Sequence, residues 1–332
     1  MTLQNALEKI AQRASLSKDE GRAVFLRVLR GEVSPAQLGA LLMGLRTKGE
    51  TGEELAGAVE AVRASAVRVE IGDCPAIDTC GTGGDGLAMV NISTAAAFVV
   101  AGAGVPVAKH GNRSASGRVG SADVLAALGV PVERPAGEVA AAIRNKNFGF
   151  MFAPAFHPAM KHAAPVRKEL GVRTIFNLIG PLANPALPPF QLVGVPEERF
   201  VDLVANAFAA LGVKRALVVH GSGGADEATL EGPFHVARVE GGVVKREVID
   251  PRSAGFAVSP NAALAGGDAA ANAAAIQGVL AGKNGPVSDT VILNAGLAIA
   301  VARNVTICEG VDAARESVKS GRAAKALEAA RC

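Results

Sequence analysis

The sequence contains neither tryptophan nor tyrosine, and its four cysteines are scattered singly along 332 residues. It has no C-x-x-C pair, and a chain of this length can stabilise itself by burying apolar side chains, so a small disulfide-stabilised scaffold is excluded. The N-terminus mixes charges with helical periodicity and has no apolar signal core, so export is not expected. We therefore expect a reducing, cytoplasmic location.

Long runs of like charge are also missing. The 34 Lys and Arg residues against 31 Asp and Glu residues give a net charge of +3, and 49% of the chain is hydrophobic. This composition excludes a disordered chain and offers no basic surface for nucleic acid. The uncharged segment 86–108 contains Asn91, Ser93, Thr94 and Pro106, so we expect a buried strand, loop and helix there and no membrane span.

The first 68 residues are predicted to be helical only. Capping boxes at 17–20 (SKDE), 34–37 (SPAQ) and 51–54 (TGEE) each place a hydroxyl at the N-cap and a carboxylate or amide three residues later. Apolar residues then recur at three- and four-residue spacing, which is typical of amphipathic helices. A small all-helical domain is therefore expected over residues 1–68.

From Ala76 onward, short β-branched runs alternate with helical patterns, which is typical of βαβ units. Ser121 is expected to cap one helix, and Pro196 to open another that ends at Gly212. The predicted strands are 76–79, 105–108, 148–152, 191–195 and 216–219, with a β-hairpin over 234–249. The fold class is thus α/β, with a small helical domain and a large α/β domain that has a mostly parallel central sheet.

A glycine-rich turn, GTGGDG at 81–86, follows the first predicted strand. Successive backbone N–H groups in such a turn can bind phosphate. The spacing also satisfies G-x-G-x-x-G, but no helix begins at the third glycine and no acidic residue follows about 20 positions later, so a dinucleotide site is disfavoured. Asp85 would repel a bare pyrophosphate unless a cation or a ribose hydroxyl lay between them. A purely structural turn is the alternative.

Two polar segments follow the next predicted elements. NIST at 91–94 begins a helix, where it is either a simple N-cap or an anion site at the positive end of the helix dipole. KHGNRS at 109–114 follows a strand, where open α/β sheets bind ligands, although a solvated loop is the alternative. His110 alone indicates no metal site, and His157 and His162 lie five residues apart, which does not place both on one helix face.

Adjacent carboxylates and an arginine complete the candidates. Asp226 and Glu227 end a second glycine-rich turn, where they could converge on a hard cation such as Mg²⁺. A charged surface turn is the alternative. Arg167 lies near a predicted helix C-terminus, where it either complements the helix dipole or binds a carboxylate in bidentate fashion.

In combination and order, these segments resemble the anthranilate phosphoribosyltransferase family of tryptophan biosynthesis. The segments are GTGGDG, NIST, KHGNRS, GSADVLAALG, the long run from HPAMKH to NPA, and the ADE turn. The resemblance implies a helical domain of residues 1–68 that is completed by about 163–188, and a phosphoribosyl-binding domain of 72–162 and 189–332. It also implies a homodimer formed through the helical part.

The activity implied by the resemblance is transfer of the phosphoribosyl group of 5-phosphoribosyl 1-pyrophosphate (PRPP) to anthranilate, with two Mg²⁺ ions. Because the arylamine is already neutral at pH 7, the chemistry leads us to expect no dedicated general base. The implied PRPP-binding residues are Gly81, Thr82, Gly83, Gly84, Asp85, Asn91, Ser93, Thr94, Lys109 and Ser121. The implied anthranilate-binding residues are Gly81, His110, Asn112 and Arg167, and the implied metal ligands are Ser93, Asp226 and Glu227. No nucleic-acid or membrane partner is expected.

Two departures and two rivals accompany this hypothesis. Met89-Val90 stands where the family commonly has Thr-Phe, and Gly117-Arg118-Val119 lacks a common hydroxyl but keeps a cation. A pyrimidine nucleoside phosphorylase has a similar fold and phosphate loop, but it has a Lys or His and a Ser just before its Thr-Gly-Gly. A non-catalytic nucleic-acid-binding relative could dispense with Arg167 and the carboxylate pair, which are present here.

Overall fold

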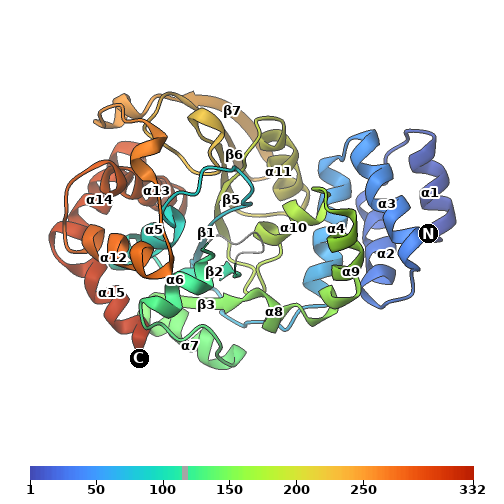
Figure 1. The fold of residues 1–332 in the computed structure, drawn as a ribbon, viewed down its shortest axis with the longest axis horizontal. Helices are drawn as coiled ribbons and strands as arrows, with labels where there is room; N and C mark the ends of the chain where they lie inside the picture. Colours follow the sequence, from blue (N-terminus) through green and yellow to red (C-terminus); the bar gives the residue numbers. More distant parts are fainter. Residues whose placement is uncertain (114–118) are drawn as a thin grey trace.

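A computed structural model describes residues 1–113 and 119–332 of the protein. A group of helices from the start of the chain lies at one end of the molecule, and a larger α/β part with a seven-stranded sheet forms the rest (Figure 1). This arrangement confirms the predicted fold class. The N-terminus lies at the far end of the helical part and the C-terminus at the far end of the α/β part (Figure 1).

The helical part begins as its capping signals predict. The first four helices are α1 (Leu3–Ala11), α2 (Lys18–Leu29), α3 (Pro35–Lys48) and α4 (Gly52–Ala64). All three predicted capping boxes form, with Ser17, Ser34 and Thr51 accepting hydrogen bonds from the backbone three residues later. Each satisfies backbone N–H groups that a helix start otherwise leaves unpaired.

A mid-chain segment packs against these helices through α9 (Ala164–Leu170), which contacts α3, and α10 (Phe176–Leu182), which contacts α4. The short helix α8 (Ala153–Phe156) precedes them and packs against β3. One apolar cluster includes Leu41 and Val59 from the first helices together with Val166 and Phe176 from the later ones. The rings of Phe25 and Phe176 meet edge to face at 5.7 Å. The domain limits themselves stay a prediction.

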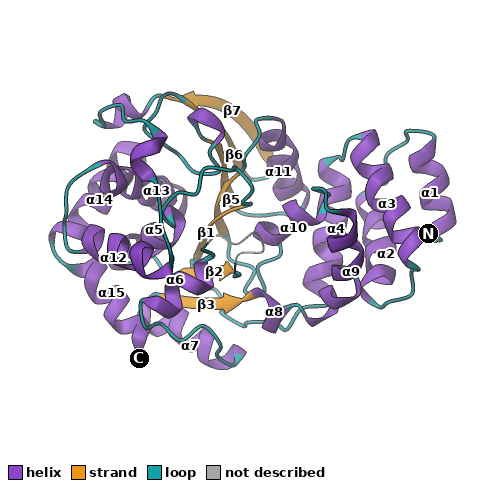
Figure 2. Cartoon of the chain, viewed as in Figure 1, coloured by secondary structure: helices purple, strands orange, loops and turns teal. Residues whose placement is uncertain are grey.

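The central sheet has the strand order β3-β2-β1-β4-β5-β6-β7. The strands are β1 (Ile77–Gly81), β2 (Val107–Gly111), β3 (Phe148–Phe152), β4 (Phe190–Gly194), β5 (Arg215–His220), β6 (Phe234–Glu240) and β7 (Val243–Ile249). The first five are parallel, and the last two form the expected antiparallel hairpin at one edge (Figure 2). The sheet is therefore mostly parallel, as predicted.

The predicted ends of β1 and β2 were too early. Both strands continue into residues that read as loop in the sequence, because neighbouring strands still pair with them: Gly81 lies opposite Gly194, and Gly111 opposite Phe152. The prediction also placed Lys109 and His110 after their strand, whereas both lie within β2. Strand pairing, which single-residue propensity does not register, decides these boundaries.

Helices cover both faces of the sheet (Figure 2). They are α5 (Ile92–Gly102), α6 (Ser121–Ala127), α7 (Ala136–Lys146), α11 (Arg199–Ala210), α12 (Ala269–Leu280), α13 (Pro286–Arg303), α14 (Ile307–Lys319) and α15 (Arg322–Arg331). Successive residues of a strand face opposite sides, so Leu192 and Leu217 join the cluster around α5 and α13, whereas Val193 and Val218 join the one around α4 and α11.

Two helix starts differ from the prediction. Ser121 is the first residue of α6, not its cap; the cap is Gly120, whose N–H donates to Asp123 at 3.0 Å. Helix α11 begins at Arg199, three residues after Pro196, although Gly212 follows its end with a φ of +69°. Proline restrains the chain here without starting the helix.

No single helix of the described residues is long and apolar enough to cross a membrane. Helices α13 and α14 satisfy such a test of length and composition as a pair, with a bend of 117° between them. Segment 86–108 consists of a loop, helix α5 and the start of β2, as the sequence predicts.

Candidate functional site

Segments far apart in the sequence meet at the carboxyl end of the parallel strands. The Gly83 N–H donates to Asp226 Oδ2 at 2.6 Å, and the Ser93 N–H donates to Glu227 Oε1 at 3.1 Å. A Cβ on Gly81 would lie 2.2 Å from Asp226 Oδ2, so only glycine leaves room for this approach. The glycine-rich turn, the start of α5 and the carboxylate pair thus form one cluster.

The two carboxyl groups of this cluster carry unusual electrostatics. Burial raises the pKa of Glu227 to about 7. Burial, with repulsion from Glu227 and then Asp85, raises the pKa of Asp226 well above its usual range. The backbone hydrogen bonds from Gly83 and Ser93 oppose these shifts without cancelling them. Three acidic groups in a small buried region strongly favour the arrival of a cation.

Lys109 is a buried cation that belongs to this network of charged groups. Its side chain is 1% exposed, and Nζ donates to the Thr79 carbonyl at 2.6 Å. Burial lowers the pKa of Lys109, whereas Asp78 and Glu227 act to raise it. The ammonium group therefore lies at the Thr79 carbonyl, just before the turn, where it acts as a counter-ion to the buried carboxylates. The position of Lys109 in the sequence did not indicate this role.

The donor set suits a magnesium ion better than a transition metal. The predicted ligands are the hydroxyl of Ser93 and the carboxylates of Asp226 and Glu227, all of them hard oxygen donors. Among the residues that the structure describes, no group of three or more His, Cys, Asp or Glu side chains forms a metal cage. Such a site fits Mg²⁺, which keeps waters and binds substrate phosphates alongside one or two carboxylates.

The polar side chains at the start of α5 do not cap the helix. Asn91 occupies the N-cap position but makes no capping bond; its amide donates to the Val119 carbonyl at 2.9 Å, and its oxygen accepts from Asn272 at 3.0 Å. The hydroxyls of Thr82 and Thr94 are buried and have no hydrogen-bond partner among the described atoms. The simple N-cap interpretation of this segment is therefore wrong.

A pair of buried histidines lies beside this cluster. His110 Nδ1 is 3.2 Å from the Gly180 carbonyl, and its Nε2 is 3.2 Å from Nε2 of His157. Since a carbonyl only accepts, His110 must donate through Nδ1 and accept at Nε2 from His157. Burial lowers the pKa of His110 to about 3 and that of His157 to about 4, so both rings are neutral near pH 7.

Arg167 lies on α9, outside the cluster of carboxylates. Its guanidinium carbon lies 5.1 Å from the centre of the Phe176 ring, and burial lowers its pKa. Stacking on Phe176 holds the guanidinium by its face and leaves its edge N–H groups to bind a planar anion. The structure records no hydrogen bond or ion pair between Arg167 and the other candidate residues that it describes.

Comparisons with known proteins agree on one family. Two family models match: "Glycosyl transferase family, helical bundle domain" over residues 4–66, and "Glycosyl transferase family, a/b domain" over residues 73–324. An anthranilate phosphoribosyltransferase from a Bradyrhizobium species is 50% identical over 98% of this chain and 97% of its own length. The chain belongs to the anthranilate phosphoribosyltransferase family.

Solved structures of anthranilate phosphoribosyltransferases share the fold. The Thermus thermophilus enzyme superposes with a TM-score of 0.92 at 44% identity, covering 97% of each chain. A Saccharomyces cerevisiae enzyme, solved in complex with PRPP and Mg, has a TM-score of 0.89 at 26% identity and covers 98% of this chain and 96% of its own. The fold is thus that of the family from end to end.

The loop after β2 is described only at its two ends. The Asn112 carbonyl accepts from the Ala122 N–H at 3.2 Å and from Ser121 Oγ at 3.4 Å, which joins the two loop ends. Arg118 and Gly117, two of the residues that depart from the family pattern, lie outside the described residues. Of the other departures, Val90 is buried in the large core, and Met89 forms an isolated β-bridge with Ala265.

Sequence reasoning missed two buried residues that support the site. The Asp78 carboxylate accepts from Asn184 at 2.7 Å and from the His110 N–H at 3.3 Å, and Asn184 also donates to the Ala108 carbonyl. Asp78 lies three residues before the glycine-rich turn, and the sequence assigned it no role. An acidic residue within an otherwise apolar strand was the available signal; nothing local indicated Asn184.

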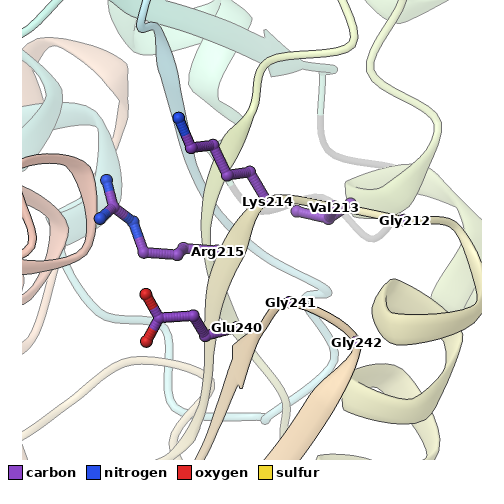
Figure 3. Close-up of a pocket in the computed structure, with 7 residues that line it drawn as sticks. All are labelled: Gly212, Val213, Lys214, Arg215, Glu240, Gly241 and Gly242. Carbon is purple, nitrogen blue, oxygen red and sulfur yellow. The ribbon is translucent and has the colours of Figure 1, made fainter.

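A surface hollow of about 480 Å³ lies away from this cluster. It is lined by Gly212, Val213, Lys214, Arg215, Glu240, Gly241 and Gly242 (Figure 3). These residues lie where β5 begins and where β6 turns into β7, at the amino ends of the parallel strands. Ligands of open α/β sheets bind at the opposite ends, so we assign this hollow no part in the site.

Proposed function

We propose that this protein transfers the phosphoribosyl group of PRPP to the amine of anthranilate, releasing pyrophosphate and forming N-(5-phosphoribosyl)anthranilate. This would be the second step of tryptophan synthesis from chorismate. The observation that carries the proposal is the meeting of Asp226 and Glu227 with Gly83 and Ser93, more than a hundred residues away in the sequence. The names of the full-length relatives support the same activity.

The proposed PRPP side consists of the glycine-rich turn and the start of α5. Among the described residues the Gly84 N–H has no recorded acceptor and suits a phosphate oxygen, and the hydroxyls of Thr82 and Thr94 are buried donors without partners among the described atoms. When bound, Mg²⁺ would neutralise the negative charge that develops on the departing pyrophosphate. Asn91, Ser121 and Asp85 complete this side, and Lys109 acts on it as a buried counter-ion.

The proposed anthranilate side consists of Gly81, His110, Asn112 and Arg167. The guanidinium of Arg167 matches a carboxylate in shape and charge, and its stacking on Phe176 limits the orientations that it can adopt. The neutral rings of His110 and His157 add no positive charge that would compete with Arg167 for the carboxylate. Anthranilate would thereby be bound by its carboxylate while its amine stays uncharged.

The chemistry requires positioning more than proton transfer. As the bond from C1 of the ribose to pyrophosphate breaks, C1 acquires oxocarbenium character, and the arylamine nitrogen attacks it without prior deprotonation, because the amine is already neutral at pH 7. The nitrogen then loses one N–H proton to solvent water, which leaves free pyrophosphate and a product whose amine is neutral. The protein's residues therefore place the amine against C1 and surround the leaving group with N–H donors. No residue is assigned as a general base.

The assembly and the location belong to the same proposal. We expect a homodimer in which the helical parts of two copies meet, and a cytoplasmic enzyme whose partners are its small-molecule substrates. Two Mg²⁺ ions with the pyrophosphate are expected, held by Ser93, Asp226 and Glu227. These expectations rest on the resemblance in sequence, and the chemistry of the oxygen donors is compatible with them.

The decisive experiment follows the loss of anthranilate fluorescence when PRPP and Mg²⁺ are added. The chain has neither Trp nor Tyr, so the protein contributes almost no fluorescence of its own. We expect turnover with PRPP that is abolished when the metal is chelated. Folded protein without turnover would reject the proposal, and phosphorolysis of thymidine or uridine without Mg²⁺ would instead favour a nucleoside phosphorylase.

A further inference from the structure

Arg173, in the short segment between α9 and α10, reaches across to the glycine-rich turn. Its Nη1 donates a hydrogen bond of 2.9 Å to the carbonyl oxygen of Gly83. The same nitrogen would lie 1.6 Å from a Cβ on Gly84. Gly83 and Gly84 also have φ angles of +70° and +84°, which favour glycine. The guanidinium therefore lies directly against the turn, at a place where only glycine leaves room for it.

This contact sets the direction of a backbone N–H group. In a planar trans peptide the C=O bond and the following N–H bond point in opposite directions, so turning the Gly83 carbonyl toward Arg173 turns the Gly84 N–H away from it. The neighbouring Gly83 N–H is already held by Asp226 at 2.6 Å. Among the described residues, no acceptor is recorded for the Gly84 N–H, which leaves it available for a phosphate oxygen.

Arg173 is itself held by the helical part of the molecule. Nη1 of Arg46, in the last turn of α3, donates to the Arg173 carbonyl. On the C-terminal side, the Thr174 N–H donates to Asn177 at 2.9 Å, which anchors the chain as it enters α10. The contact thus extends from α3 through the backbone and guanidinium of Arg173 to the turn after β1.

We propose that Arg173 is a positioning residue that orients the Gly83–Gly84 peptide toward the pyrophosphate of PRPP, and that Arg46 holds it in place from the helical part. The inference rests on the proposed function. Arg167 lies six residues earlier, on α9, so α9 and the segment that follows it carry both the proposed carboxylate ligand for anthranilate and the group that orients the phosphate turn. Arg173 thereby links the positions of the two substrates.

The first test is the Arg173→Ala variant, measured by steady-state kinetics with each substrate varied in turn. Losing a charge-assisted hydrogen bond should raise the KM for PRPP by roughly tenfold to a hundredfold, with a smaller change in the KM for anthranilate. Arg173→Lys should recover part of this loss, because lysine keeps the charge but not the planar guanidinium. Lys168→Ala removes a nearby exposed charge and should leave both KM values unchanged.

These outcomes separate the inference from the proposed function. A wild-type protein without turnover would reject the proposed function. An active wild type whose KM for PRPP does not change in a folded Arg173→Ala variant would overturn the role of Arg173 alone. Titration with Mg²⁺ and pyrophosphate provides a second measure, and here the variant should bind more weakly than wild type by a similar factor.

The second test asks whether Arg173 and Gly84 are in direct contact. Gly84→Ala introduces a methyl group where Nη1 of Arg173 now lies, and it also strains the backbone, because Gly84 has a positive φ. Removing the guanidinium relieves the steric clash but not the backbone strain. Gly84→Ala should therefore reduce kcat/KM for PRPP by a smaller factor in the Arg173→Ala background than in wild type. Equal losses in the two backgrounds would show that the contact does not exist. Arg46→Ala should raise the KM for PRPP less than Arg173→Ala does.

Discussion

The two sides of the proposed site bury ionisable groups of opposite kinds. On the PRPP side burial raises the pKa of Glu227 to about 7, and on the anthranilate side it lowers the pKa of His110 to about 3. In both cases burial favours the neutral form. The consequences differ between the two sides. Neutral histidines can persist beside the neutral amine of anthranilate. The carboxylates, in contrast, would bind phosphate through a metal ion, and they need that ion in order to ionise.

This comparison teaches that the two sides require different partners from solution. Asp226 receives only one backbone hydrogen bond against burial and two neighbouring acids, so without metal its charge is poorly compensated. His110, in contrast, has partners for both ring nitrogens in the neutral state, namely the Gly180 carbonyl and His157, while Nδ1 of His157 has no partner among the described atoms. The first side needs a cation to compensate its carboxylates, whereas the second needs no counter-ion.

The largest expected effect comes from removing the acids of the PRPP side. The double variant Asp226→Asn plus Glu227→Gln should lose Mg²⁺-dependent turnover by about a thousandfold or more, because a bound metal stabilises the leaving group by several kcal/mol. Steady-state kinetics over a range of Mg²⁺ concentrations measures this. The control Glu316→Gln plus Glu328→Gln removes two exposed carboxylates elsewhere. Retained Mg²⁺ dependence in the site variant would remove the carboxylates from the metal site.

A smaller effect is expected on the anthranilate side. Arg167→Ala should raise the KM for anthranilate by roughly tenfold to a hundredfold, the usual cost of losing a hydrogen bond to a charged group, while the KM for PRPP changes little. Kinetics with anthranilate varied at saturating PRPP measures this effect. Lys168→Ala, on the adjacent exposed position, serves as the matched control. If the KM for PRPP rose instead, Arg167 would belong to the other side.

The sequence predicted best what depends on neighbouring residues. The capping boxes at Ser17, Ser34 and Thr51 and the β6–β7 hairpin form as expected, since each depends on residues a few positions apart. The glycine-rich turn was also recognised as a candidate site. The contact of Asp226 with Gly83 spans 143 positions, and local pattern carries no information about it. The family resemblance, not spacing, assigned Ser93, Asp226 and Glu227 to one metal site, and the contact of Asp226 with Gly83 was not predicted.

Side-chain direction was the other limit. Lys109 was expected among the phosphate ligands, yet its ammonium donates to the Thr79 carbonyl below the turn. The sequence assigned no role to Arg173, because its contact with Gly83 depends on how the α9–α10 connection passes the turn after β1. Such directions follow from packing between elements, and they become visible only when the chain is folded.

A comparable effect is expected on stability, and it has opposite signs on the two sides. In metal-free buffer the folded state keeps Glu227 protonated up to about pH 7, whereas the unfolded chain ionises near 4.5. Wild type should therefore lose stability relative to Glu227→Gln as the pH rises from about 4.5 to 7. For His157, whose pKa falls from 6.5 to about 4, wild type should lose stability relative to His157→Gln as the pH falls through that range.

Urea unfolding of the three proteins between pH 4 and 8 tests these opposite slopes. One pKa unit corresponds to about 1.4 kcal/mol, so differences on the order of 1–3 kcal/mol across each window are expected. Added Mg²⁺ should abolish the loss of stability that wild type shows relative to Glu227→Gln as the pH rises, because a bound cation favours the ionised carboxylate. It should leave the pH dependence of stability relative to His157→Gln unchanged. Slopes of the same sign for both variants, or a histidine slope that responds to Mg²⁺, would contradict the division of the site into a metal-dependent side and a neutral side.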